Sequence, residues 1–190
     1  MRKIIAALQV SVDGCIEGPN GELDWVESWD DTFDLIDQVD TCILGSRMYP
    51  GYEQYWCAIL ADPEGVLAFT GRPALKSELD YAQFAARTPH IVLSRMMAAV
   101  EWDNARIVRD IAEIRNLKQQ PGKDMFAIGG AALVGSLMNE NLVDELRLVV
   151  QPIVLGEGKA LFKDVTGRHA LKLLAHKSLG AGRVRLSYGT

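Results

Sequence analysis

The stretch Met125-Phe126-Ala127-Ile128-Gly129-Gly130-Ala131 decides the fold of this chain. Its apolar half is typical of a buried β-strand, and its glycines mark a turn into a helix. Two other apolar runs end in small or basic residues: Thr41-Cys42-Ile43-Leu44 precedes Gly45-Ser46-Arg47, and His90-Ile91-Val92-Leu93 precedes Ser94-Arg95. Such strand ends gather free backbone N–H groups at one sheet edge, where they favour phosphate. We therefore expect a phosphate-rich ligand across these ends, and a dinucleotide is the leading candidate.

Strand and helix patterns alternate through the first half of the chain. Residues 4–10 are almost continuously apolar, which predicts a central strand buried on both faces. Five apolar residues recur at three- and four-residue steps and predict an amphipathic helix: Val26, Trp29, Phe33, Ile36 and Val39. Four aspartates lie on the other side of that helix: Asp30, Asp31, Asp34 and Asp37. Residues 48–56 are typical of a short aromatic-rich helix or an irregular turn, broken by Pro50-Gly51.

The second half adds helices at 75–86, at 111–119 with Asp110 as its cap, and at 131–139. Residues 145–150 alternate as a strand, and residues 170–176 and 183–188 predict a terminal antiparallel hairpin. The expected fold class is α/β. A central mixed, mostly parallel sheet ends in an antiparallel C-terminal hairpin and carries helices on both faces.

Length and composition narrow the class of protein. A chain of 190 residues with 48% hydrophobic residues fits a single domain over residues 1–190. The net charge of −5 argues against a general nucleic-acid binder. The three cysteines have no metal-type spacing, so no metal site is expected. The chain shows no signal-peptide pattern and no apolar stretch near the ~20 residues that span a bilayer, so we expect a cytoplasmic protein without membrane association.

Six short motifs, in this order, resemble the dihydrofolate-reductase-like superfamily: residues 5–8 (IAAL), 11–14 (SVDG), 44–49 (LGSRMY), 92–95 (VLSR), 128–131 (IGGA) and 152–158 (PIVLGEG). Within that superfamily the chain is most similar to the branch that includes the reductase domain of bacterial riboflavin biosynthesis. The resemblance covers nearly the whole chain. It implies a three-layer fold and a bound NADPH.

The resemblance also implies which residues bind the cofactor. Gly45, Ser46, Arg47 and Met48 match the segment that starts a helix beside the cofactor phosphates, and Ser94 and Arg95 match the segment that meets the adenosine 2′-phosphate. Gly129, Gly130 and Ala131 match the glycine pair at the pyrophosphate, and Ala7 and Ile16 match positions lining the nicotinamide. The chain departs from the family at Ser46, where a basic residue is common and the arginine follows one position later.

The resemblance implies hydride transfer from NADPH to a C=N or C=O bond of a small heterocyclic molecule. Candidates for handling the proton are Asp13, Asp30 and Asp31, with an ordered water as an alternative. Asp13 is also typical of a turn aspartate that bonds its own backbone. If the riboflavin-type reading holds, the substrate is a phosphorylated ribosylamino-pyrimidine, and Lys159 is a candidate for its phosphate. A pterin reductase and a catalytically inactive nucleotide-binding module are the alternatives.

The terminal β-rich segment predicts how copies of the chain associate. It offers a strand edge or face that can pair two subunits, as members of the resembling family commonly do. We therefore expect a homodimer that binds a small-molecule substrate.

Overall fold

The computed structural model describes residues 1–26, 29 and 31–190. Their helices and strands follow in this order: β1 (Ile4–Val10), β2 (Cys15–Glu17), β3 (Val39–Gly45), α1 (Tyr49–Ala61), α2 (Lys76–Arg87), β4 (His90–Leu93), β5 (Ala105–Val108), α3 (Ile111–Gln119), β6 (Asp124–Ala127), α4 (Ala131–Asn139), β7 (Glu145–Val150), β8 (Lys159–Ala160), β9 (Lys172–Gly180) and β10 (Arg183–Gly189).

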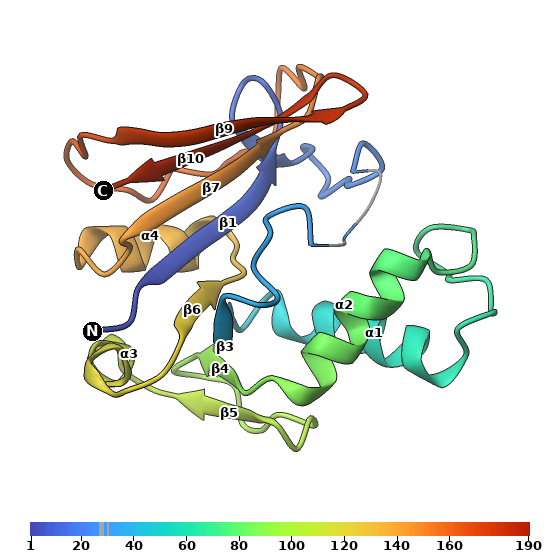
Figure 1. The fold of residues 1–190 in the computed structure, drawn as a ribbon, viewed down its shortest axis with the longest axis horizontal. Coiled ribbons are helices and arrows are strands. Elements are labelled where there is room, and N and C mark those ends of the chain that lie inside the picture. Colours follow the sequence, from blue (N-terminus) through green and yellow to red (C-terminus); the bar gives the residue numbers. More distant parts are fainter. Residues whose placement is uncertain (27–28, 30) are drawn as a thin grey trace.

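The described residues form an eight-stranded sheet in the order β5-β4-β3-β6-β1-β7-β10-β9 (Figure 1). The first six strands of this order pair in parallel, whereas β10 runs antiparallel to both β7 and β9. β2 and β8 form a separate two-stranded ribbon. The structure confirms the predicted mixed sheet with its antiparallel C-terminal hairpin.

Helices cover both faces of the sheet, as predicted. On one face α1 and α2 lie side by side and pack with strand residues such as Leu44 and Phe126 (Figure 1). On the other face α3 and α4 pack with strand residues such as Ile4 and Ile43. Ile4, Ile5 and Ile43 are fully buried because the central parallel strands are covered on both sides.

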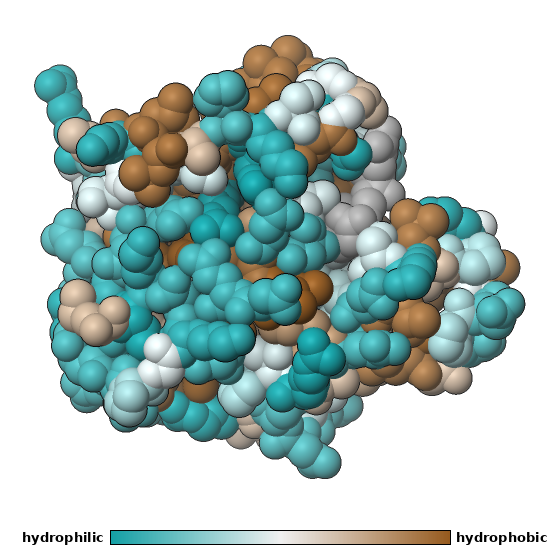
Figure 2. Space-filling view, viewed as in Figure 1, coloured by the Kyte–Doolittle hydropathy of each residue, from teal (hydrophilic) through white to brown (hydrophobic). Residues whose placement is uncertain are grey.

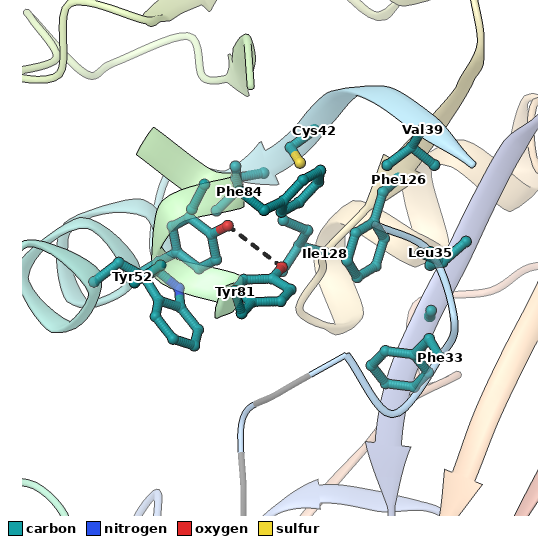
Figure 3. Close-up of a cluster of buried hydrophobic side chains, with 14 of the residues drawn as sticks. Phe33, Leu35, Val39, Cys42, Tyr52, Tyr81, Phe84, Phe126 and Ile128 are labelled. Carbon is teal, nitrogen blue, oxygen red and sulfur yellow. Dashed lines mark hydrogen bonds between the residues drawn. The ribbon is translucent and has the colours of Figure 1, made fainter. Parts of the chain in front are cut away.

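The aromatic cluster on the α1–α2 face is dense (Figure 3). Phe33 meets Phe126 edge-to-face with ring centroids 6.0 Å apart, and Tyr52 and Tyr81 direct their hydroxyl groups toward each other at 3.4 Å. Burial raises the pKa of both tyrosines well above the ordinary value. Both hydroxyls are therefore neutral, and the cluster works as core.

The helix predicted between Val26 and Val39 is wrong. The described residues of this segment form turns and bends, and β3 begins at Val39. Asp31 accepts hydrogen bonds from the N–H groups of Leu35 at 2.8 Å and Ile36 at 3.0 Å. A short polar side chain that bonds nearby backbone in this way competes with the helical pattern.

The break predicted at Pro50-Gly51 is also wrong. Proline lies in the first turn of α1, where its missing N–H has no helical partner to lose, so the helix continues to Ala61. The other predicted elements are present, with end points that differ by a few residues. Asp110 caps α3, as expected, by accepting a hydrogen bond from Ala112 N–H at 2.8 Å.

Candidate functional site

The carboxyl ends of β3, β4 and β6 lie at the same end of the sheet. β4 and β6 both pair in parallel with β3, with Gly45 opposite Leu93 and Ile43 opposite Ala127. Parallel neighbours end at the same edge. The Gly45–Arg47, Ser94–Arg95 and Gly129–Gly130 segments therefore lie on three adjacent strands, in the order β4-β3-β6, and β1 follows β6.

The Gly129-Gly130 turn has a backbone that favours glycine. The φ angles are +79° and +87°, in the left-handed region that side-chain-bearing residues avoid. A Cβ atom on Gly129 would lie 2.7 Å from Leu8 Cδ2, whereas one on Gly130 would have open space around it. Gly130 caps α4 without a side-chain hydrogen bond, so the first N–H groups of α4 keep their capacity to bind an anion. Ala131, the first residue of α4, is buried.

The end of β3 leads directly into α1. Met48 N–H donates to the Gly45 carbonyl at 3.1 Å, and Met48 then occupies the cap position of α1 without a side-chain hydrogen bond. Ser46 is half-buried and Arg47 is exposed. The N-terminus of α1, with the exposed Arg47 beside it, therefore lies at the same end of the sheet as the glycine pair.

The two residues matched to the nicotinamide lie in different core clusters. Ala7 is on β1 and packs with the α1–α2 face, whereas Ile16 is on β2 and packs with the α3–α4 face. Both are buried, at 3% and 7% exposure. Ala7 follows Ala6, which pairs with Ala127 at the end of β6, and Ile16 belongs to the β2–β8 ribbon.

Asp13 connects two loops. Its carboxylate accepts hydrogen bonds from the N–H groups of Leu155 at 3.2 Å and Gly156 at 2.8 Å, and Val12 N–H donates to the Ile153 carbonyl at 2.8 Å. A hydrogen bond from the Ser11 side chain, joined by those two backbone N–H groups, lowers the pKa of Asp13 to about 2. The side chain is therefore an anion at neutral pH, and it bonds the 152–158 segment as well as its own backbone.

Asp31 lines an open cavity of about 340 Å³ on the α1–α2 face. The cavity is bounded by the 31–36 turns, the start of α2 and the β9–β10 turn: Asp31, Thr32, Asp34, Ile36, Ser77, Asp80, Leu179 and Arg183. Hydrogen bonds from Arg185 and Lys177 lower the pKa of Asp34, although partial burial opposes them. Asp30 lies outside the residues that the structure describes.

Arginines of the C-terminal strands hold the 31–38 segment in place. Arg147 donates to the Phe33 carbonyl at 2.8 Å and to Gln38 Oε1 at 2.8 Å, and it pairs with buried Glu145 at 2.6 Å. Arg185 pairs with Asp34 at 2.6 Å and donates to the Thr32 carbonyl at 3.1 Å. Our sequence reasoning missed these residues, and the alternation of arginines in the last strand was the signal that could have found Arg185.

Metal clusters and membrane-spanning helices are not found in the part of the chain that the structure describes. No three His, Cys, Asp or Glu side chains are grouped so that they could hold a metal ion. Within the same residues, no helix has the length and hydropathy needed to cross a membrane.

Comparisons with known proteins identify the family of the chain. A model of the RibD C-terminal domain family matches residues 2–184. The Bacillus subtilis (strain 168) protein YyaP, whose function is uncharacterised, is 35% identical over 98% of this chain and 94% of its own length.

Two solved structures share the fold. A protein from Shewanella sp. PV-4, provisionally named as a riboflavin biosynthesis protein, has a TM-score of 0.69 at 18% identity and covers 98% of both chains. Dihydrofolate reductase from Enterococcus faecalis, complexed with NADP(H), has a TM-score of 0.65 at 15% identity and covers 98% of this chain and 95% of its own. With the match over residues 2–184, the chain belongs to the RibD C-terminal domain family, and it shares its fold with dihydrofolate reductase.

Proposed function

We propose that this protein is an NADPH-dependent reductase that transfers a hydride to a C=N or C=O bond of a small heterocyclic substrate. The observation that carries the proposal is the convergence of three strand ends at one sheet edge, where α1 and α4 begin without side-chain caps. The fold neighbour from E. faecalis holds NADP(H), which supports the same class of cofactor here.

The residues at the edge fit the charge and shape of NADPH. The N–H groups that open α4 suit the pyrophosphate, and the absence of a Cβ on Gly130 leaves room for it. Arg47 and Arg95 are exposed, and neither has a hydrogen bond or ion pair to another described residue. We assign Gly45, Ser46, Arg47 and Met48 to the phosphates of the cofactor and Ser94 and Arg95 to its 2′-phosphate. When bound, the cofactor supplies the hydride.

Asp31 is our candidate for handling the proton. It lines the cavity beside the sheet, whereas Asp13 is bonded to the 152–158 segment and its pKa is too low for a proton donor at neutral pH. The backbone hydrogen bonds from Leu35 and Ile36 fix the position of the Asp31 carboxylate. The chain would thereby orient a carboxylate toward the substrate side of the site.

The substrate class has to be tested with more than one type of compound. The riboflavin-type reading calls for a site for the substrate phosphate, and Lys159, our candidate for it, pairs with Glu17 at 2.7 Å. Asp31, Asp34 and Asp80 around the cavity favour a heterocycle with N–H donors over an anionic group. A pterin is therefore the second candidate substrate.

The experiment is an NADPH-oxidation assay with purified protein against phosphorylated ribosylamino-pyrimidines and pterins. We expect turnover with at least one compound, and Asp31→Asn should lower kcat while NADPH binding is unchanged. NADPH binding without turnover on either class would support the nucleotide-binding module instead. Failure to bind NADPH would overturn the proposal.

We also propose that the protein forms a homodimer through β9. This nine-residue strand is the last in the sheet order, and its outer edge has no strand partner among the described residues. Leu173 and Leu174 are 50% and 51% exposed, and Figure 2 shows hydrophobic side chains gathered near the upper edge of the molecule, where β9 runs. A strand can pair with the same strand of a second copy. Leu174→Lys should convert a dimer to a monomer in light scattering, and a monomeric wild-type protein would contradict the proposal.

A further inference from the structure

The turn that follows β4 is held by its own serine. Ser94 N–H donates to the Val108 carbonyl at 3.0 Å, which continues the pairing of β4 with β5. Ser94 Oγ then accepts hydrogen bonds from the N–H groups of Met96 at 3.3 Å and Met97 at 3.0 Å. The hydroxyl group of Ser94 therefore shapes the turn, and Arg95 lies exposed at its tip.

Arg109 closes the same turn from the other side. Its Nη1 atom donates one hydrogen bond to the Ser94 carbonyl at 3.0 Å and another to the Met97 carbonyl at 2.6 Å. These two carbonyls stand at the first and last residues of the turn. A guanidinium donor to a carbonyl is charge-assisted, so each bond is stronger than one between neutral groups.

The backbone of Arg109 is itself anchored. Its N–H donates to Glu113 Oε1 at 2.8 Å, and Glu113 belongs to the capping box of α3. The backbone of Arg109 is thus held between the end of β5 and the start of α3. The turn that carries Arg95 is connected through Arg109 to this frame.

We propose that Arg109 is a positioning residue: it holds the Ser94–Met97 turn so that Arg95 can meet the 2′-phosphate of NADPH. The inference rests on the proposed function and adds a residue that sets the preference for NADPH over NADH. Both hydrogens of Nη1 are used by the turn carbonyls. Arg109 therefore acts through the turn, and Arg95 makes the phosphate contact.

The test measures NADPH and NADH dissociation constants by calorimetry with the full-length protein. The variants are Arg95→Ala, Arg109→Ala, the double variant, and Arg115→Ala as a matched control. Arg115 is an α3 arginine paired with Glu140 on the surface. Loss of one charge-assisted phosphate contact should reduce the NADPH:NADH preference about 10-fold in Arg95→Ala and about fivefold in Arg109→Ala.

A residue that acts through Arg95 has no further effect once Arg95 is gone. The double variant should therefore lose much less than the sum of the two single losses, and Arg115→Ala should match the wild type. Additive losses in the double variant would mean that Arg109 contacts the phosphate directly, and this would overturn the positioning role. An unchanged preference in Arg109→Ala would also overturn it, while a loss in Arg95→Ala would leave the proposed function standing. A wild-type protein without preference for NADPH would overturn both.

A second readout needs no cofactor. Amide hydrogen exchange at Met96 and Met97 should be faster in apo Arg109→Ala than in apo Arg115→Ala, because only the first variant releases the turn. Arg109→Lys keeps the charge without the planar donor group, and we expect it to restore part of the protection. Equal exchange in the two alanine variants would contradict the proposal that Arg109 holds the Ser94–Met97 turn. If Arg109→Ala does not fold, the dissociation constants and the amide exchange are both measured on Arg109→Lys.

Discussion

The Gly129-Gly130 turn and the 31–38 segment both adjoin the central sheet, but different interactions define their conformations. The glycine turn is defined locally by the positive φ angles of Gly129 and Gly130, although Leu8 from β1 also approaches Gly129. The 31–38 segment is held by Arg147 and Arg185, which come from strands more than 100 residues away in the chain. Local backbone rules thus shape the turn at the end of β6, whereas long-range arginines hold the 31–38 segment.

Arg147→Ala should have the largest effect on stability. It removes the bonds to Phe33 and Gln38 and leaves Glu145, at 6% exposure, as a buried charge without its partner. We expect a loss of about 3 kcal/mol in the free energy of unfolding, measured by urea denaturation. Arg115→Ala breaks an exposed pair and should cost less than ~1 kcal/mol. Equal losses would show that the 31–38 segment does not depend on Arg147.

Gly129→Ala tests the conformation of the Gly129-Gly130 turn. Alanine at φ +79° is strained, and its Cβ would meet Leu8 at 2.7 Å, so we expect a loss of about 2 kcal/mol together with weaker NADPH binding. Gly51→Ala is the control, because a Cβ there meets no atom within 4 Å. Since Gly51 lies in α1, that change should raise stability by about 0.5 kcal/mol. An unaltered unfolding curve for Gly129→Ala would contradict the assigned strain.

Asp31 can be tested for structure and chemistry separately. Asp31→Ala removes the acceptor for Leu35 and Ile36, and we expect a loss of about 1 kcal/mol. Asp31→Asn keeps an acceptor oxygen but cannot act as the same acid or base. It should retain more of the stability than Asp31→Ala while lowering kcat. Unfolding curves and steady-state rates on the same samples distinguish the two roles, and full activity in Asp31→Asn would remove Asp31 from the mechanism.

The hydrogen bonds from Leu155 and Gly156 to Asp13 should have the smallest effect on stability, and spectroscopy can detect them. Because the folded pKa lies near 2, below the ordinary 3.8, any stability that the link contributes is present above the ordinary value and is lost as the pH falls toward 2. The amide resonances of Leu155 and Gly156 should therefore show no titration step at pH 3.8 in nuclear magnetic resonance spectra. A step at the ordinary aspartate value would show that the link does not form.

Much of the fold was predictable because its signals are local. A nearly continuous apolar run at 4–10 favoured a strand covered on both faces, and Asp110 followed by an apolar period favoured the start of a helix. The 26–39 stretch has an equally regular apolar period, yet its described residues are not helical. Phe33 and Leu35 both enter the core there, although a helix would place them on different sides.

The sequence by itself determined most of the strands and helices and the positive φ angles of the glycine turn, since each depends mainly on neighbours along the chain. Tertiary structure alone decided which arginine holds which loop. Arg109 reaches the Ser94–Met97 turn and Arg147 reaches Phe33 only after the strands have paired. The physical reason is that apolar periodicity and glycine geometry act over a few residues, whereas a charged side chain bonds whichever backbone groups the folded sheet brings within about 3 Å.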